Sequence, residues 1–399
     1  MIKVYLKKSR EESVKRFHPW IFSGAIHKLE GVEEDGAMAS VYSSDGKALA
    51  VGHYQIGSIA VRVLEFQTDT LPENFWEKRI EAAYRFRSVL GLAENESTTA
   101  YRLIHGEGDM LPGLIIDIYN DTAVIQAHSA GMFLAREEIT EALKRTYGKK
   151  LRAVYDKSSA TAPFKAGLQL SDGYIYGNET HPASIKENGI SFFVDWCSGQ
   201  KTGFFLDQRD NRELVGKYSK GKNLLNLFCY TGGFSMYALA SGAISVTSVD
   251  SSRTAMEMLE KNIGLNREAG IVLNDAKHDS VCDDAIEYLK KSQKGQYDVI
   301  VVDPPAFAKH RAAIPNALRA YQRLNAAAID KIAPGGIVFT FSCSQAVDKT
   351  AFAEAIFSAA AQTGRRVRIL HRLTQPADHP VNIYHPEGEY LKGLVIYVE

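Results

Sequence analysis

From residue 221 to the C-terminus, strand-like and helix-like patterns alternate along the chain. The strand-like runs are Asn223–Phe228, Ser245–Asp250, Tyr297–Asp303 and Gly336–Ser342. Because each run leads into a helical segment, neighbouring strands should be parallel, with helices on both faces of the sheet. The pattern therefore predicts an α/β fold with a doubly wound, mostly parallel sheet, which binds ligands at the carboxyl ends of its strands.

Two regions with different sequence patterns precede this sheet. Residues 1–70 predict a small β-rich module, and residues 71–187 predict a small α+β region with helical patterns over Phe75–Leu90 and Phe133–Tyr147. Residues 188–399 form the third region, which opens with a predicted hairpin of Ile190–Trp196 and Lys201–Leu206. We therefore expect three domains. The strands predicted in the first are Ile2–Leu6, Ala37–Tyr42, Leu49–His53 and Ile59–Glu65, and a hairpin is predicted around Asn120-Asp121 in the second.

Composition excludes several classes of protein. No apolar run approaches the ~18 residues of a membrane span, and the mixed-charge start lacks the apolar core of a signal peptide. The four cysteines form no CxxC pair, which disfavours a zinc finger or a disulfide framework. We therefore expect a cytoplasmic protein without a membrane partner and without a metal. Lys+Arg and Asp+Glu are equal at 47 each, so a polyanion must be held by a local patch.

The N-terminal module contains a candidate patch of this kind. Lys8, Arg10 and Arg16 lie in a basic stretch shortly before Trp20. Basic residues beside an aromatic ring suit phosphate contacts combined with base stacking. The alternative is a solvated basic edge next to a tryptophan of the core.

A candidate cofactor site follows the first strand of the predicted sheet. Gly232-Gly233 lets the backbone approach a ligand closely, and Asp250-Ser251 ends the next strand, where a carboxylate can accept both hydroxyls of a ribose. Neither GxGxxG nor GxxxxGK[ST] is present, so a nucleoside without a pyrophosphate, such as S-adenosylmethionine, fits best. Asp275-Ala276 is expected after the third strand, beside the adenine. Each carboxylate could alternatively be an ordinary strand-end cap.

A rigid turn follows the fourth strand. Pro304 and Pro305 stop the ladder after Asp303 and fix the backbone as far as Phe307. Such a turn suits a planar substrate with a polar edge, such as a flipped base. A purely structural turn is the alternative.

Cys343 ends the fifth strand and should share an edge of the sheet with Asp303. A thiolate that adds to carbon 6 of cytosine makes carbon 5 nucleophilic enough to accept a methyl group. This position distinguishes Cys343 from Cys197, Cys229 and Cys282, which we expect to be packed core thiols.

Over essentially its whole length, the chain resembles the bacterial large-subunit (23S) ribosomal RNA cytosine-5 methyltransferases of the RlmI type. The resemblance rests on long motifs, of which KTGFFLDQRDNR, ADHPV and PEGEYLKG are the most specific. The matching stretches are His18–Gly24, Tyr101–Ile104, Asp109–Gly113, Gln200–Asp210, Tyr230–Phe234, Thr340–Ser344, Ala377–Val381 and Pro386–Gly393.

The resemblance implies an N-terminal PUA RNA-binding domain, a central α+β domain and a C-terminal Rossmann-like methyltransferase domain. It implies S-adenosylmethionine as cofactor, 23S ribosomal RNA as partner and Cys343 as nucleophile, with Asp303 beside it. Gln208 and Arg209 would lie near the cofactor with Phe228, Tyr230 and Thr231, and His379 would shape the substrate pocket. The family commonly has Lys where this chain has Ala306, which puts a substrate contact from that position in doubt.

Two other functions remain open at this stage. An amino-group methyltransferase acting on adenine N6 or guanine N2 would use the DPPAF turn and would not need Cys343. A non-catalytic RNA-binding assembly factor would keep the fold without the chemistry. The sequence also leaves a monomer and a homodimer open.

Overall fold

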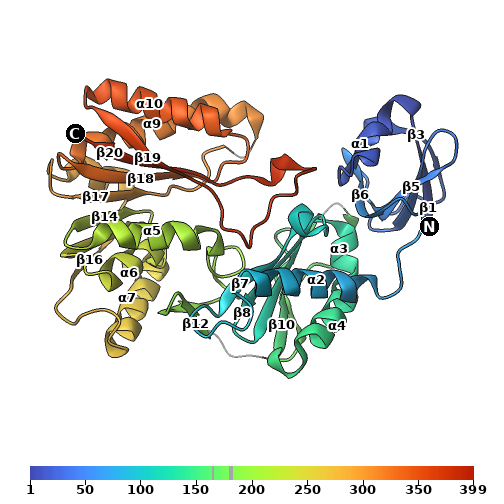
Figure 1. Ribbon diagram of the computed structural model, residues 1–399, viewed down its shortest axis with the longest axis horizontal. Helices are drawn as coiled ribbons and strands as arrows, with labels where there is room; N and C mark the ends of the chain where they lie inside the picture. The colour runs from blue at the N-terminus through green and yellow to red at the C-terminus, as the bar shows by residue number, and fades with distance from the viewer. Residues whose placement is uncertain (164–165, 179–182, 309) are drawn as a thin grey trace. The chain divides into compact units, whose positions relative to one another are not determined.

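The computed structural model describes residues 1–163, 166–178, 183–308 and 310–399 (Figure 1). The chain divides into two compact units, and neither is a single continuous segment. The N-terminal unit comprises Met1–Lys186, Val194–Leu206 and Ala377–Gly388. The C-terminal unit comprises Glu187–Phe193, Asp207–Pro376 and Glu389–Glu399.

The first sheet lies at the start of the N-terminal unit and has its own hydrophobic core. Among the described residues its strand order is β2-β6-β5-β4-β1-β3. Val4, Val41 and Val61 are fully buried in that core, and a short helix, α1 (Glu12–Lys15), adds Val14 to it. All four strands predicted here are confirmed. The strands are β1 (Ile2–Leu6), β2 (Trp20–Phe22), β3 (Ile26–Glu30), β4 (Met38–Tyr42), β5 (Ala48–Tyr54) and β6 (Ile59–Phe66).

The second sheet of this unit has the order β11-β10-β9-β8-β7 within the described ranges and packs around a separate core. The predicted hairpin around Asn120-Asp121 is confirmed as β8 and β9. The single helix predicted over Phe133–Tyr147 is instead two, because Ala135 ends α3 and precedes α4. The elements are β7 (Ala100–His105), β8 (Leu114–Tyr119), β9 (Thr122–Ala127), β10 (Ala153–Asp156), β11 (Gly173–Tyr176), α2 (Phe75–Val89), α3 (Ala130–Leu134) and α4 (Arg136–Tyr147).

The predicted hairpin of Ile190–Trp196 with Lys201–Leu206 is wrong. The strand β13 (Ile190–Val194) pairs instead with β12 (Ala183–Glu187), across a turn at Asn188 (φ 49°) and Gly189 (φ 82°). Asn-Gly is a strong signal for a two-residue hairpin turn. After β13, Asp195 accepts the backbone N–H groups of Cys197 and Ser198, and this turn ends the strand.

The C-terminal unit confirms the doubly wound α/β fold. In the part of the chain that the structure describes, its sheet has the order β16-β15-β14-β17-β18-β20-β19. The first five strands in this order are parallel, and β20 is antiparallel to both of its neighbours. The strands are β14 (Asn223–Leu227), β15 (Ser245–Asp250), β16 (Lys277–Cys282), β17 (Val299–Val302), β18 (Gly336–Ser342), β19 (Val367–Leu373) and β20 (Lys392–Val398).

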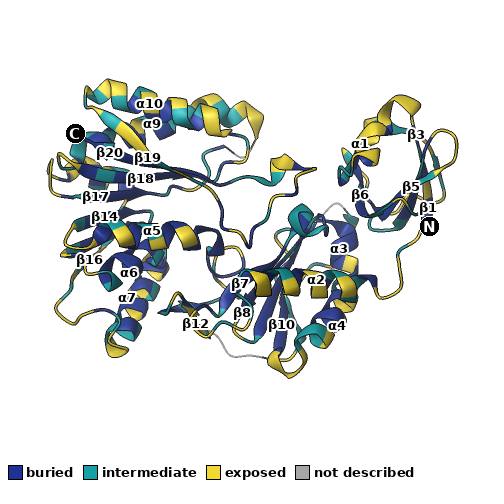
Figure 2. Ribbon diagram, viewed as in Figure 1, coloured by how far each residue is buried: buried dark blue, intermediate teal, exposed yellow. Residues whose placement is uncertain are grey.

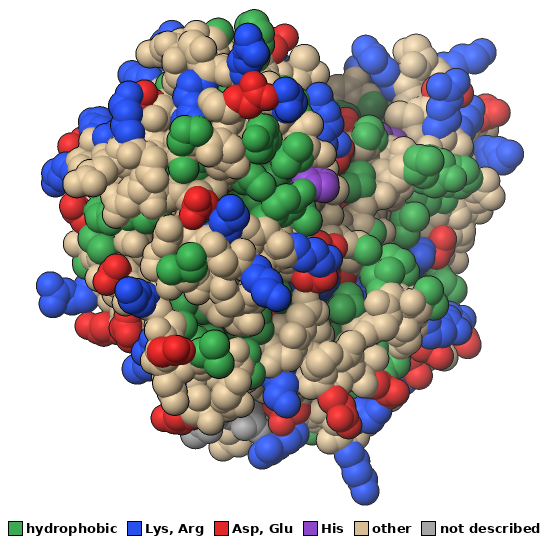
Figure 3. Space-filling model, turned by 60° about the vertical axis from the view of Figure 1, so that its left-hand side comes forward, with side chains coloured by type: hydrophobic (Ala, Val, Ile, Leu, Met, Phe, Trp, Pro, Cys, Tyr) green, Lys and Arg blue, Asp and Glu red, His purple; other side chains and the backbone are tan. Residues whose placement is uncertain are grey.

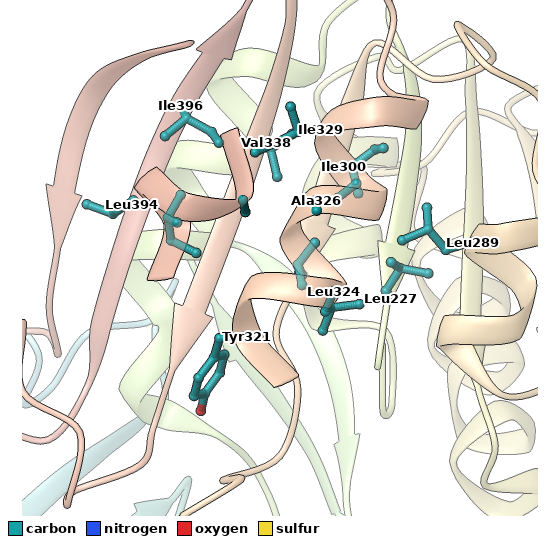
Figure 4. Packing of buried hydrophobic residues seen from close by; sticks show 14 of the residues in the cluster. Leu227, Leu289, Ile300, Tyr321, Leu324, Ala326, Ile329, Val338, Leu394 and Ile396 are labelled. Carbon is teal, nitrogen blue, oxygen red and sulfur yellow. The ribbon is translucent and has the colours of Figure 1, made fainter. Parts of the chain in front are cut away.

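Helices cover both faces of this sheet and bury its apolar side chains. Strand residues are mostly buried, whereas the helices alternate buried and exposed faces (Figure 2). On one face, Leu324 and Ile329 of α9 pack with Ile300 and Val338 of the sheet (Figure 4). The helices are α5 (Arg209–Ser219), α6 (Gly233–Ala240), α7 (Arg253–Glu268), α8 (Ala285–Lys291), α9 (Ile314–Lys331) and α10 (Lys349–Thr363). Within the described ranges, no helix combines the length and apolar character needed to cross a bilayer.

Candidate active site

Four adjacent parallel strands of the C-terminal unit end at one edge of the sheet. In the order β15, β14, β17, β18, the first strand ends at Asp250, and the other three are followed by the turn that leads to Gly232, by Asp303 and by Cys343. The pairing of Val302 with Thr340 sets the ends of β17 and β18 next to each other. The structure therefore brings Asp303 and Cys343 to neighbouring positions at the ligand-binding edge, as expected.

The turn after β14 is tightly wound. Phe228 (φ 58°), Tyr230 (φ 48°) and Gly232 (φ 83°) all have left-handed backbone conformations, and Gly232 precedes the first residue of α6. A Cβ on Gly232 would lie 2.0 Å from Leu259 of α7. The sequence predicts that this glycine lets a ligand approach the backbone closely. In the structure, the side chain nearest to it is the packed Leu259. Thr231 is buried in the same turn, where its carbonyl accepts a 3.0 Å bond from Asn262.

Asp250 joins this turn to the next strand. One of its carboxylate oxygens accepts the N–H of Tyr230 and the other accepts the N–H of Ser252, each at 2.9 Å, with Ser251 exposed between them. A carboxylate can accept about four hydrogen bonds, so capacity remains for two ribose hydroxyls. The donors and acceptors present at this position therefore fit an adenosine-type ligand.

The placement of Asp275 and Ala276 was predicted wrongly. Both residues precede β16, and because β16 runs parallel to β15 they lie at the edge opposite Asp250. The carboxylates that follow β16 are Asp283 and Asp284. Asp284 caps α8 through the N–H groups of Ile286 and Glu287, whereas Asp283 is half-buried at the ligand edge. Sequence reasoning missed Asp283 because β16 is a mostly exposed edge strand without a clear apolar pattern.

Gln208 connects the start of α5 to the end of β17. Its side-chain nitrogen donates a 3.0 Å bond to Asp303, and its oxygen accepts a 2.6 Å bond from Asn211. Gln208 and Arg209 are both buried, and Asp207 accepts a 2.7 Å bond from the hydroxyl of Tyr390. The DQR segment therefore lies against the candidate catalytic edge.

The turn that carries Cys343 is fixed by hydroxyl groups. Tyr321 of α9 lies within 2.9 Å of the hydroxyls of both Ser342 and Ser344. The Ser344 hydroxyl also accepts a 3.2 Å bond from the N–H of Ala308, which ties this turn to the segment after Asp303. Cys343 between the two serines is half-buried.

The two prolines that follow Asp303 differ in their exposure to solvent. Pro304 is buried and Pro305 is exposed, while the Phe307 ring packs 4.8 Å from the ring of Tyr321. Phe307 therefore supports the Cys343 turn as well as the loop it belongs to. Of the other three cysteines, Cys229 is buried as expected. Cys197 and Cys282 are exposed, so they are not the core thiols that the sequence predicted.

A buried lysine, Lys392, lies beside the Cys343 turn. Its ammonium donates 2.7 Å hydrogen bonds to the carbonyl oxygens of Ser344 and Val347. Burial lowers the pKa of Lys392 to about 8, and the negative charge of a Cys343 thiolate is the largest influence that opposes this shift. In the sequence, Lys392 is distinguished only as part of the matching stretch Pro386–Gly393.

His379 belongs to the N-terminal unit, whereas Asp250, Asp303 and Cys343 belong to the C-terminal unit. Its ring is 1% exposed and lies 3.1 Å from the carboxylate of Asp378, which also accepts a 3.0 Å bond from the N–H of Arg102. This burial favours a structural role for His379 over the predicted contact with substrate.

Trp20 is half-buried and is held in place by contacts within the protein. Its indole N–H donates a 2.8 Å bond to Glu107, and its ring packs 4.2 Å from that of His385. His385 therefore contacts part of the ring that is predicted to stack on a base, and the rest of the side chain is accessible.

The basic residues of the first module are exposed. Lys8 and Arg10 lie on a single 3-10 turn, and Arg16 pairs with Glu12 at 2.8 Å. Lys8 also lines a pocket of about 800 Å³ together with Lys15 and Lys47. Elsewhere, acidic and basic side chains are interspersed over the face shown in Figure 3. Glu11 and Asp45 line the same pocket as Lys8, and Lys15 pairs with Glu11 at 2.7 Å, so the positive charge of this pocket is partly balanced.

Residue types that bind metals gather near Trp20. The potential ligand atoms of His18, His385 and Glu387 lie within 4.8 Å of one another. These are three ligands, whereas a closed structural zinc site takes four.

Comparison with known proteins relates both units to described families. Residues 167–392 match the family model of S-adenosylmethionine-dependent methyltransferases, and residues 4–66 match that of PUA-like domains. The ribosomal RNA large subunit methyltransferase I of Aeromonas salmonicida is 42% identical over 399 residues, covering 98% of each chain. The protein of the same name from Tolumonas auensis is 41% identical over 398 residues, with the same coverage.

A solved structure agrees over the full length. SMU.776, provisionally assigned as a methyltransferase and crystallised with SAH, is 26% identical and has a TM-score of 0.84, with 100% of both chains covered.

Proposed function

Because this chain belongs to the S-adenosylmethionine-dependent methyltransferases that include ribosomal RNA large subunit methyltransferase I, we propose that it methylates carbon 5 of a cytosine in 23S ribosomal RNA. Its substrate is RNA and its cofactor is S-adenosylmethionine. The observation that carries the finer proposal is the position of Cys343 beside Asp303, at the ends of two adjacent parallel strands. A thiol at this position is what cytosine-5 chemistry requires and what methylation of an amino group does not.

In the proposed reaction, the Cys343 thiolate attacks carbon 6 of the cytosine and forms an S–C6 bond. The electrons of the C5–C6 double bond then make carbon 5 nucleophilic. When bound, S-adenosylmethionine supplies the electrophilic methyl group that carbon 5 accepts. A water molecule takes the proton from carbon 5, the electrons of that C–H bond re-form the C5–C6 double bond, and the S–C6 bond breaks so that Cys343 leaves as the thiolate.

Residues of the carboxyl edge would hold the two ligands. Asp250 would accept the ribose hydroxyls, and Asp283 takes over the contact with the adenine amino group first assigned to Asp275. The turn Phe228–Gly233 would enclose the cofactor, with Ser251, Gln208 and Arg209 nearby. Asp303, held by Gln208, would accept a hydrogen bond from the cytosine amino group, between Pro304-Pro305 and Cys343.

Transfer of radiolabelled methyl groups to protein-free 23S ribosomal RNA tests this proposal, with the modified nucleoside identified by mass spectrometry. We expect the wild type to form 5-methylcytidine and Cys343→Ala to form none. Cys197→Ala is the matched control, because Cys197 is exposed and lies in the other unit. Methylated adenosine or guanosine, with Cys343→Ala still active, would instead assign the DPPAF turn to methylation of an amino group.

We also place the reaction in the cytoplasm, where ribosomal RNA is available to a bacterial enzyme of this family. A homodimer is the assembly we would test first, by sedimentation equilibrium of the cofactor-bound chain. A single species with the mass of one chain would exclude it.

A further inference from the structure

Lys392 begins β20 directly opposite the end of β18. In the antiparallel ladder its Cα pairs with that of Ser342, the residue before Cys343. The side chain is buried, and its ammonium donates to the carbonyl oxygens of Ser344 and Val347, both at 2.7 Å. A full positive charge is therefore fixed next to the segment that carries the proposed nucleophile.

Nearby acidic groups are engaged with other partners. Asp348 caps α10 by accepting the N–H of Ala351 at 2.8 Å. Glu389 pairs with Lys349 and accepts a 3.1 Å bond from Thr374. In the described part of the chain, no carboxylate oxygen forms an ion pair with Lys392, although Asp348 and Glu389 act on it from a distance.

A buried ammonium that is satisfied only by carbonyl dipoles is costly, because it has lost its hydration without gaining an opposite charge. Cys343 lies between Ser342, which pairs with Lys392 in the ladder, and Ser344, whose carbonyl accepts the lysine's hydrogen bond, and a thiolate there would favour the protonated form of Lys392. Attraction between charges is mutual, so the ammonium favours the thiolate equally. The other titratable groups around the pair are Tyr321, whose hydroxyl bonds Ser342 and Ser344, and Asp303 at the neighbouring strand end.

We propose that the buried ammonium of Lys392 stabilises the Cys343 sulfur as a thiolate, which makes Lys392 a positioning residue for the nucleophile. This inference rests on the proposed function, in which Cys343 attacks carbon 6. On ionisation, the thiol proton leaves to solvent and the ammonium stays protonated, so the pair forms without further proton transfer. The same charge helps at the end of the reaction, because a stabilised thiolate leaves carbon 6 more readily.

The pair has a defined pH window. Below the thiol pKa the sulfur is protonated, and above about 8, the pKa to which burial lowers Lys392, the ammonium is lost. The stabilised thiolate should therefore be populated most at neutral to slightly alkaline pH. Removing the cation should raise the thiol pKa toward its ordinary value near 8.5.

Alkylation of the full-length chain by iodoacetamide, without RNA, measures this directly. The rate at Cys343 is followed by peptide mass spectrometry from about pH 6 to about pH 10, which spans ordinary thiol titration. We expect Lys392→Met to raise the midpoint of the profile by about one pH unit and to slow alkylation at neutral pH roughly tenfold. Lys392→Arg, which keeps the charge, should restore a midpoint close to that of the wild type.

Lys331→Met is the matched control. Lys331 also donates to two backbone carbonyls, those of Lys290 and Ser292, in the same unit, but it is not beside Cys343. This variant should leave the Cys343 profile unchanged. A shift in Lys331→Met equal to that in Lys392→Met would overturn the proposal, because loss of a structural lysine would then suffice.

The wild type offers a test that does not depend on any variant folding. A free cysteine peptide alkylated under the same conditions serves as the reference, because the Cys197 thiol is hydrogen-bonded to Tyr155. If Cys343 titrates no lower than the free peptide, or if Lys392→Met leaves its midpoint in place, Lys392 does not stabilise the thiolate. Failure of the proposed function is seen separately, as a wild type that makes no 5-methylcytidine.

Discussion

Asp250 and Asp275 allow a comparison of two single residues. Asp250 lies at the carboxyl end of β15, whereas Asp275 precedes the amino end of the parallel strand β16. We expect Asp250→Ala to weaken S-adenosylmethionine binding about 10- to 100-fold, since a charged acceptor of two hydroxyls contributes about 1.5–3 kcal/mol. Asp275→Ala should bind the cofactor like the wild type. Titration calorimetry with S-adenosylhomocysteine measures both. Equal losses in the two variants would remove Asp250 from the site.

Site residues could be predicted from the sequence where they directly follow a strand with a clear apolar pattern. Asp303 follows the apolar run Val299–Val302, and Cys343 follows Gly336–Ser342, so both could be placed from the sequence. The contacts that hold them could not. Gln208 reaches Asp303 across 95 positions in the chain, and Lys392 reaches Ser344 across 48. Such partners are brought together only in the folded topology, and a local sequence pattern carries no information about them.

At the scale of elements, Gly232 and Gly242 separate two effects of adding a Cβ. Their φ angles are 83° and 85°, but a Cβ at Gly232 would lie 2.0 Å from Leu259, whereas one at Gly242 would meet nothing within 4 Å. We expect Gly242→Ala to cost about 1 kcal/mol from backbone strain alone. Gly232→Ala should cost about 2 kcal/mol more, because the buried side chain of Leu259 must leave its packed position to make room for the methyl group.

Urea unfolding of the two variants measures the difference in free energy. The double variant Gly232→Ala with Leu259→Ala should recover part of the loss at Gly232, since the clashing methyl group is gone. If the double variant is no more stable than the sum of the single changes predicts, Leu259 is not the source of the cost.

The elements that were predicted wrongly share a physical cause. β16 is an edge strand with exposed residues along its length, so it lacks the apolar pattern that marked β14 and β17. The true partner of β13 precedes an Asn188-Gly189 turn, and the alternation of residues 190–206 suggested a different hairpin. Strands that are buried on both faces could be predicted from their apolar runs. Strands that are recognisable only by their pairing partners could not.

At the scale of the whole molecule, a net charge of zero means that RNA must be attracted by local groups. We expect Lys8→Ala with Arg10→Ala to weaken binding of ribosomal RNA and to reduce the slope of log K against log salt by about 2. Lys290→Ala is the control, because Lys290 is exposed but belongs to the other unit. Filter binding over a salt series measures the slope. An unchanged slope in the double variant would move the RNA contact elsewhere.

The segment Ala377–Gly388 leaves the C-terminal unit after β19, joins the N-terminal unit and returns for β20. Within it, Asp378 accepts the N–H of Arg102, and its carbonyl accepts a 2.7 Å bond from the buried Arg87. During synthesis, Arg87 and Arg102 therefore leave the ribosome long before Asp378, so the buried hydrogen bonds of these two arginines are complete only when almost the whole chain has emerged, although the first sheet has a core of its own. The enzyme cannot finish folding piece by piece as it is made, and a nascent chain stalled before residue 377 would hold neither unit in its final form.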